Sequence, residues 1–220
     1  MFGKVVFMTA ARKGQSPFDL RASEWDSNPA RVALARAVVE ALRAAVPLRA
    51  DMRVMDFGAG TGLVSLGLLP LVGEVTAVDA SGEMLRVLGE KVQSLGAANL
   101  RALHCDIAQA ELSSEPFDLI VSSMTLHHLP DVPYVLGRLR PALRKGGWVA
   151  LADLDAEDGS FHADKTGVYH NGFERSTVCR WLEEAGFANA RSCEAYRMTR
   201  PASDGALHTY PIFLVTARRG

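Results

Sequence analysis

The sequence has few cysteines, no long apolar run and almost no net charge. Its three cysteines (Cys105, Cys179 and Cys193) are far apart and match neither a metal-ligand spacing nor a disulfide framework, which favours a reducing, cytoplasmic location. No apolar run approaches the roughly 18 residues that cross a bilayer, and the N-terminal stretch is too short and broken for a signal peptide. The formal net charge of −1 provides no polybasic surface. We therefore expect no membrane partner, and the charge argues against a nucleic-acid partner.

What the sequence does contain is a regular alternation of short apolar runs and helical runs. Continuous apolar runs predict buried parallel strands with helices between them; the runs are 53–57, 74–80, 100–106, 117–123 and 148–154. After a predicted helix at 174–187, the runs 190–200 and 206–219 follow without another helix, which predicts a hairpin. The sequence therefore predicts an α/β fold: a Rossmann-like, seven-stranded, mostly parallel sheet with helices on both faces and a C-terminal antiparallel hairpin strand.

A glycine-rich loop follows the first of these strands, in the stretch RVMDFGAGTGLVSL. Its spacing is G-x-G-x-G, at Gly58, Gly60 and Gly62. A dinucleotide loop has the spacing G-x-G-x-x-G, and a Walker loop ends in a lysine that is missing here. Glycines still allow a ligand to lie directly on the backbone, so the loop predicts a ligand other than a dinucleotide or a nucleoside triphosphate.

Acidic residues end three successive predicted strands. Asp79 stands where a carboxylate accepts hydrogen bonds from both hydroxyls of a ribose, and Asp106 stands where it could meet an adenine amino group. Each acid has a plainer alternative as a helix cap: Asp79 or Ser81 for the helix that follows, and Asp106 for 107–112. Together with Asp56 and the glycine loop, the acids favour a ligand site.

The combination of motifs resembles the class I S-adenosylmethionine-dependent methyltransferases of the small-molecule type. The matching segments are VMDFGAGTG, VTAVDAS with the Met-Leu that follows, CDI, FDLIVSSMTLHHL and LRPALRKGGWVAL, which together span about residues 50–155. The resemblance implies S-adenosylmethionine as methyl donor and S-adenosylhomocysteine as product. It also implies an arm and helix at 1–45 that cover the active site of a cofactor-binding domain at 46–220, the two making one structural domain.

The same resemblance implies which residues bind the cofactor. They are Asp56, Gly58, Ala59, Gly60, Asp79, Ala80, Met84, Asp106, Ile107 and Ser122. By this analogy the glycine loop meets the methionine part, Asp56 its amino group and Asp79 the ribose. Asp106 and Ile107 meet the adenine edge.

The acceptor end of the site is predicted from the histidines. Methyl transfer from a sulfonium needs orientation of the acceptor, and a base only where the acceptor carries a proton that must leave. His127 is the first candidate for catalysis and His128 the second, with stacking or loop orientation as the alternative for each. His162 and His170 are further candidates in 154–173, a segment long enough for a lid, with packing as the alternative for His170; Asp153, just before this segment, is another side chain to test. His162 and His170 show no metal-ligand spacing, so no metal site is predicted.

Three hypotheses for function remain open on the sequence. The first is methylation of a small molecule; the second is methylation of a macromolecule such as tRNA or a protein; the third is a non-catalytic cofactor-binding module. The sequence leaves the choice between monomer and homodimer open. In the N-terminal arm, Phe18 and Trp25 either close over the ligand or pack the arm onto the domain.

Overall fold

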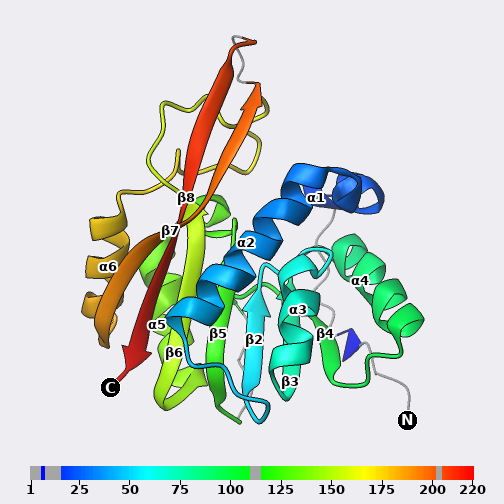
Figure 1. Cartoon of the computed structure of the whole chain (residues 1–220), viewed down its shortest axis with the longest axis vertical. Helices are drawn as coiled ribbons and strands as arrows, with labels where there is room; N and C mark the ends of the chain where they lie inside the picture. The colour runs from blue at the N-terminus through cyan, green and yellow to red at the C-terminus, as the bar shows by residue number, and fades with distance from the viewer. Residues whose placement is uncertain (1–5, 8–15, 110–114, 202–204) are drawn as a thin grey trace.

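The computed structural model describes residues 6–7, 16–109, 115–201 and 205–220. A single eight-stranded sheet runs through them in the order β1-β4-β3-β2-β5-β6-β8-β7 (Figure 1). Its strands are β1 (Val6–Phe7), β2 (Arg53–Phe57), β3 (Glu74–Asp79), β4 (Leu100–His104), β5 (Phe117–Ser123), β6 (Leu143–Leu154), β7 (Phe187–Pro201) and β8 (Leu207–Arg219). Strands β1 to β6 pair in parallel, whereas β8 runs antiparallel to both β6 and β7.

The predicted fold class is confirmed, with two differences in detail. All seven predicted strands are present, and the two-residue strand β1 extends the sheet beside β4. The strand predicted at 148–154 begins earlier, because α5 (Val132–Ala142) ends one residue after Pro141. Leu143 then pairs with Phe117, so the chain enters β6 directly and residues 143–147 belong to the sheet.

Helices cover both faces of the sheet and bury two apolar layers. The helices on one face are α2 (Pro29–Ala45), α3 (Leu63–Leu68) and α4 (Gly82–Leu95), and those on the other are α5 and α6 (Arg175–Glu184). Asn28 caps α2 by accepting a hydrogen bond from the Ala30 amide, and Pro29 occupies the first helical position. Within the described residues, no helix is both long and apolar enough to cross a membrane.

The parallel strands bring five loops to one edge of the sheet. The loops after β2, β3, β4, β5 and β6 all leave from the carboxyl ends of their strands, which is where ligands bind in open α/β sheets. Over this edge lie the helix α1 (Pro17–Arg21) and the 3-10 helix η1 (Ala22–Ser27), both of which contact α4 (Figure 1).

The segment between β6 and α6 contains no helix, and its two ends are joined to each other. Asp155 forms a parallel bridge with Phe173, and the Phe173 amide donates to the Leu154 carbonyl at 2.9 Å. Arg175 then makes a bidentate ion pair with Asp155, at 2.7 and 2.5 Å. Gly172 passes close to this junction with φ +73°, and a Cβ there would lie 2.1 Å from the Asp155 carbonyl oxygen.

Gly172→Ala tests this closure, with Gly167→Ala as the matched control. Gly167 has φ +74°, and among the described residues nothing lies within 4 Å of a Cβ placed there. Both variants carry the left-handed backbone cost of about 1–2 kcal/mol, and the clash adds a further 1–3 kcal/mol, roughly, at Gly172 alone. Urea unfolding should therefore show a clearly larger loss of unfolding free energy for Gly172→Ala. Equal losses would contradict the described closure.

Candidate active site

Two glycines of the glycine loop lie in close contact with neighbouring side chains, and the third, Gly60, is open. Gly58, Gly60 and Gly62 all have positive φ. A Cβ on Gly58 would lie 2.1 Å from Thr125 Oγ1, and one on Gly62 would lie 2.3 Å from Leu88 Cδ1. A Cβ on Gly60 would meet only Met84 Sδ among the described residues, at 4.0 Å. The loop therefore presents bare backbone at Gly60, beside Met84, where a ligand can lie against it.

Asp79 joins the glycine loop to the start of α4 through its two carboxylate oxygens. One oxygen accepts a hydrogen bond from the Gly60 amide at 2.7 Å, and the other accepts from the Ser81 amide at 2.8 Å. Ser81, and not Asp79, caps α4, because its hydroxyl accepts from the Met84 amide. Burial raises the pKa of Asp79. Each oxygen keeps a lone pair for a further donor, which suits the two hydroxyls of a ribose.

Asp56 is a buried acid at the end of β2. It is 1% exposed and accepts a hydrogen bond of 2.6 Å from the Ser65 hydroxyl. Burial, together with the negative charge of Asp79, raises the pKa of Asp56 to about 7. A buried carboxylate of this kind is stabilised by a cationic ligand, so the position fits an ammonium group.

Two other predicted cofactor residues have local hydrogen bonds of their own. Asp106 accepts from the Ala108 amide at 3.0 Å and from the Gln109 side chain at 2.9 Å, so it does cap the turn that follows β4. Ser122 donates to the Phe57 carbonyl at 2.9 Å and thereby ties β5 to β2 under the glycine loop. Their contacts with the cofactor stay predictions, as does that of the buried Ile107.

The N-terminal arm contacts both the glycine loop and the acceptor end. Ser81 donates to Asp19 at 2.5 Å, and Thr61 in the glycine loop donates to Asp26 at 2.6 Å. The Phe18 ring meets the His128 ring edge to face, with centroids 4.9 Å apart. These contacts place α1 and η1 against the edge that carries the predicted site.

His127 is held by a buried carboxylate that the sequence did not pair with it. His127 and Asp153 are 1% and 0% exposed, and His127 Nδ1 lies 2.6 Å from the carboxylate. Asp153 also accepts from the Leu126 amide at 2.8 Å. Because Asp153 occupies Nδ1, the imidazole donates from that nitrogen and keeps Nε2 for another partner.

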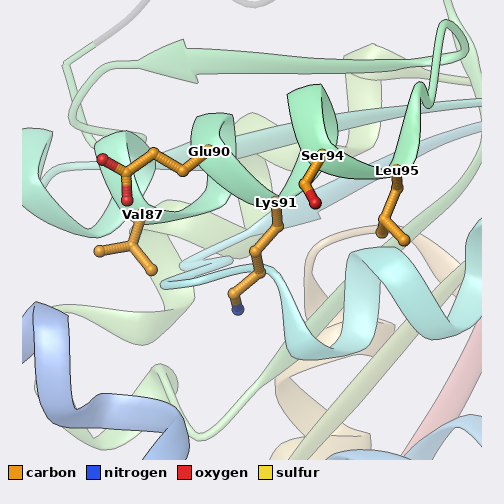
Figure 2. A pocket seen from close by; sticks show the side chains of 5 residues that line it. All are labelled: Val87, Glu90, Lys91, Ser94 and Leu95. Atoms are coloured by element: carbon orange, nitrogen blue, oxygen red, sulfur yellow. The ribbon is translucent and has the colours of Figure 1, made fainter.

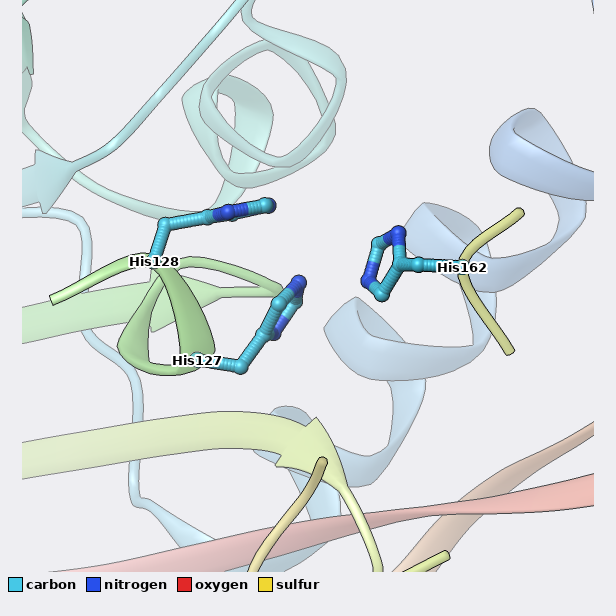
Figure 3. Close-up of side chains that lie close together, drawn as sticks. All are labelled: His127, His128 and His162. Carbon is cyan, nitrogen blue, oxygen red and sulfur yellow. The ribbon is translucent and has the colours of Figure 1, made fainter. Parts of the chain in front are cut away.

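His128 and His162 complete a group of three imidazoles (Figure 3). His128 Nδ1 donates to the Gly167 carbonyl at 2.7 Å, and His162 Nε2 is buried without a hydrogen-bond partner among the described residues. The His127 ring centroid lies 4.1 Å from that of His128 and 5.0 Å from that of His162. Burial, followed by the neighbouring His127, lowers the pKa of both His128 and His162 to about 4.

His170, the third predicted catalytic residue, lies outside this group. Its Nε2 donates to the Leu129 carbonyl at 3.0 Å, and its ring packs 5.0 Å from that of Phe173. The neighbouring Tyr169 amide donates to the His127 carbonyl at 2.9 Å. His170 therefore joins the loop after β5 to the segment before α6, which is the packing role that the sequence left as its alternative.

Comparison with known proteins decides the family. A family model described as a methyltransferase domain matches residues 30–192. This chain belongs to that methyltransferase family. An uncharacterized methyltransferase of Schizosaccharomyces pombe is 31% identical over 157 residues, which are 64% of this chain and 55% of that protein. The methyltransferase domain thus spans about half the length of the first curated relatives it matches.

Solved structures share the fold of this methyltransferase domain. The YcgJ protein of Bacillus subtilis superposes with a TM-score of 0.70 at 18% identity, over 83% of this chain and 98% of that one. Phosphoethanolamine N-methyltransferase 2 of Haemonchus contortus, in complex with phosphomonomethylethanolamine and S-adenosylhomocysteine, gives 0.67 at 18% identity, over 81% and 51%. The resemblance to class I S-adenosylmethionine-dependent methyltransferases is confirmed at the level of family and fold.

A shallow hollow on this methyltransferase domain lies apart from the predicted site residues. It runs along α4, has a volume of about 430 Å³ and is open to solvent (Figure 2). Its lining consists of Val87, Glu90, Lys91, Ser94 and Leu95. None of these is a predicted cofactor residue. Lys91 has a structural role instead, because it pairs with Asp26 and donates to the Thr61 carbonyl at 2.7 Å.

Two contacts of His127 were not predicted from the sequence, although one of them was within its reach. Asp153 ends β6, the strand beside β5, and His127 follows β5, so neighbouring strand ends could have suggested the pair. His162 lies in a segment without regular structure, and no sequence pattern places it against His127.

Asp56→Asn tests the buried acid through the pH dependence of stability, without cofactor. The pKa of Asp56 is raised on folding, so its contribution to stability is full below about pH 4 and is lost as the pH rises to about 7. At pH 8 the ionised carboxylate lowers the free energy of unfolding by up to about 4 kcal/mol. Asparagine carries no charge and avoids this loss. In thermal unfolding experiments, the stability of the variant relative to that of the wild type should rise from pH 5 to pH 8. A pH-independent difference would contradict the raised pKa.

Proposed function

We propose that this protein transfers a methyl group from S-adenosylmethionine to a small-molecule acceptor. The observation that carries the proposal is the open backbone at Gly60, whose amide donates to Asp79, in the loop that follows the buried Asp56. S-adenosylmethionine offers an ammonium group and two ribose hydroxyls, all of which donate hydrogen bonds, and it has no phosphate. Carboxylates around bare backbone fit this set of donors.

Each predicted cofactor residue has a proposed place around this ligand. The methionine part lies on Gly58, Ala59 and Gly60, with its ammonium at Asp56, and the ribose hydroxyls lie at Asp79. The adenine is bordered by Ala80, Met84, Asp106 and Ile107, with Ser122 supporting the loop from below. When bound, the cofactor supplies a methyl group that its sulfonium already activates. The protein therefore has to orient the acceptor and exclude water.

The acceptor is proposed to lie between the arm and the loops that carry the histidines. Phe18 contacts His128 from one side, and His162 approaches from the segment that follows β6. The Haemonchus contortus enzyme binds phosphomonomethylethanolamine, a small amine, which supports an acceptor of small size here. His127 faces this space with its Nε2 while Asp153 fixes its ring. We propose 1–45 as the cover of the site and 46–220 as the cofactor-binding domain.

Asp79→Ala tests the cofactor assignment. Loss of a charged hydrogen-bond partner costs about 1–3 kcal/mol of binding free energy. This corresponds to a roughly 5- to 150-fold higher dissociation constant. Calorimetric titration with S-adenosylhomocysteine measures it. Glu83→Ala is the control, because Glu83 stands four residues along the chain and its side chain pairs with the exposed Arg86. An unchanged constant for Asp79→Ala would refute the ribose assignment.

A substrate screen tests the proposed reaction, with His127→Ala as the informative variant. Small alcohols, phenols, acids and amines are incubated with S-adenosylmethionine, and methylated products and S-adenosylhomocysteine are measured by mass spectrometry. For an accepted substrate, His127→Ala should lower turnover by about 100-fold or more while cofactor affinity changes little. His208→Ala is the matched histidine control on β8. Methylation of tRNA or protein, with no small molecule accepted, would contradict the proposal.

A further inference from the structure

Three of the six histidines of the chain point their rings into one shared space (Figure 3). One ring nitrogen from each of His127, His128 and His162 lies within 4.8 Å of the other two. His127 and His128 come from η3 (Leu126–His128), directly after β5, whereas His162 comes from the segment after β6. The sequence predicts no metal site, and His128 and His162 stand 34 positions apart along the chain. The fold brings them together.

Hydrogen bonds to the outer side of the rings prepare two of these histidines as ligands. Asp153 accepts from His127 Nδ1 at 2.6 Å, and the Gly167 carbonyl accepts from His128 Nδ1 at 2.7 Å. Each bond fixes the tautomer in which Nε2 carries a lone pair. Histidines that bind metals almost always donate their other ring N–H to a carboxylate or a backbone carbonyl in this way.

His162 contributes the third nitrogen, which makes no hydrogen bond to the described residues. This nitrogen, Nε2, is buried. A buried polar atom left in this state costs free energy, and a metal ion would satisfy it. The other histidines differ: those at 104 and 170 bond the carbonyls of Ala80 and Leu129.

The spacing suits a small transition-metal ion after a modest closure. Zn²⁺ binds imidazole at about 2.0–2.1 Å, which puts two tetrahedral ligand nitrogens about 3.4 Å apart. The separations here reach up to 4.8 Å, so the rings have to approach by roughly 1.5 Å at most. Three imidazoles also leave a fourth coordination position open, as in catalytic zinc sites. Carboxylate-rich sites suit Mg²⁺ or Ca²⁺, whereas imidazole favours Zn²⁺ and its neighbours.

We propose that His127, His128 and His162 bind a divalent transition-metal ion, with Zn²⁺ or Co²⁺ as suitable probes. The ion would sit next to the glycine loop, since Thr125, two residues before His127, contacts the Gly58 carbonyl. Its open position would face the proposed acceptor space and hold an oxygen or nitrogen of the acceptor there. A nitrogen that ligates a metal cannot also accept a proton. With the ion bound, the turnover lost in His127→Ala would therefore come from loss of the ion, and metal titration distinguishes this from loss of a general base.

Metal titration of the full chain tests the proposal in the absence of S-adenosylmethionine. Protein freed of metal with a chelator is titrated with Zn²⁺ by calorimetry and with Co²⁺ by visible absorption. We expect saturation at one equivalent, with the intense absorption of four-coordinate Co²⁺. This readout does not depend on turnover, so the site can be confirmed even if the proposed methyl transfer fails. Absence of saturable binding would overturn it.

Variants assign the bound ion to these three histidines. His162→Ala removes a half-buried ligand and should weaken binding at least tenfold, and Asp153→Asn should weaken it by about 10- to 100-fold through the ring of His127. His208→Ala is the control and should bind as the wild type does. Thermal unfolding of the metal-free variants checks that they are folded. Wild-type metal affinity in folded His162→Ala would overturn the assignment.

Discussion

The buried carboxylate of Asp153 is the contact on which the proposed acceptor end of the site depends. Asp153 is wholly buried, yet it accepts hydrogen bonds from the His127 ring and from the amides of Leu126 and Leu154. These bonds compensate the cost of burying a charged group. They also fix the loop after β5 against the end of β6. The ring of His127 is thereby oriented before any ligand arrives, which is the preorganisation that methyl transfer requires of a protein.

The cofactor end of the site combines backbone shape with acids that are costly to bury. Gly58 and Gly62 pack so tightly against Thr125 and Leu88 that no side chain fits, and this packing leaves Gly60 open. The raised pKa of Asp56 shows that its ionised form is unfavourable in the folded protein. The proposed cationic ligand would relieve that cost, so the free energy lost in the free protein would add to the affinity for the ligand.

Much of this arrangement could be predicted from the sequence, and the rest depends on contacts between distant segments. Continuous apolar strands and the glycine spacing are local patterns, so the sheet, the loop and the acids at 56, 79 and 106 were predictable. The early start of β6 was not, because Leu143 pairs with Phe117 ahead of the apolar run at 148–154. Nor was the group of three histidines. His162 reaches it through a segment whose path is set by the Asp155–Phe173 bridge and the pair with Arg175, not by periodicity.

Binding of S-adenosylmethionine at the carboxyl edge of this sheet underlies the whole of the proposed function. Calorimetric titration of the unmodified full chain with S-adenosylmethionine, S-adenosylhomocysteine and NAD tests this binding most directly. We expect saturable binding of both sulfur compounds at one site and no binding of NAD, because the loop lacks the dinucleotide spacing. Binding of NAD, with neither sulfur compound bound at millimolar concentration, would contradict the proposed cofactor.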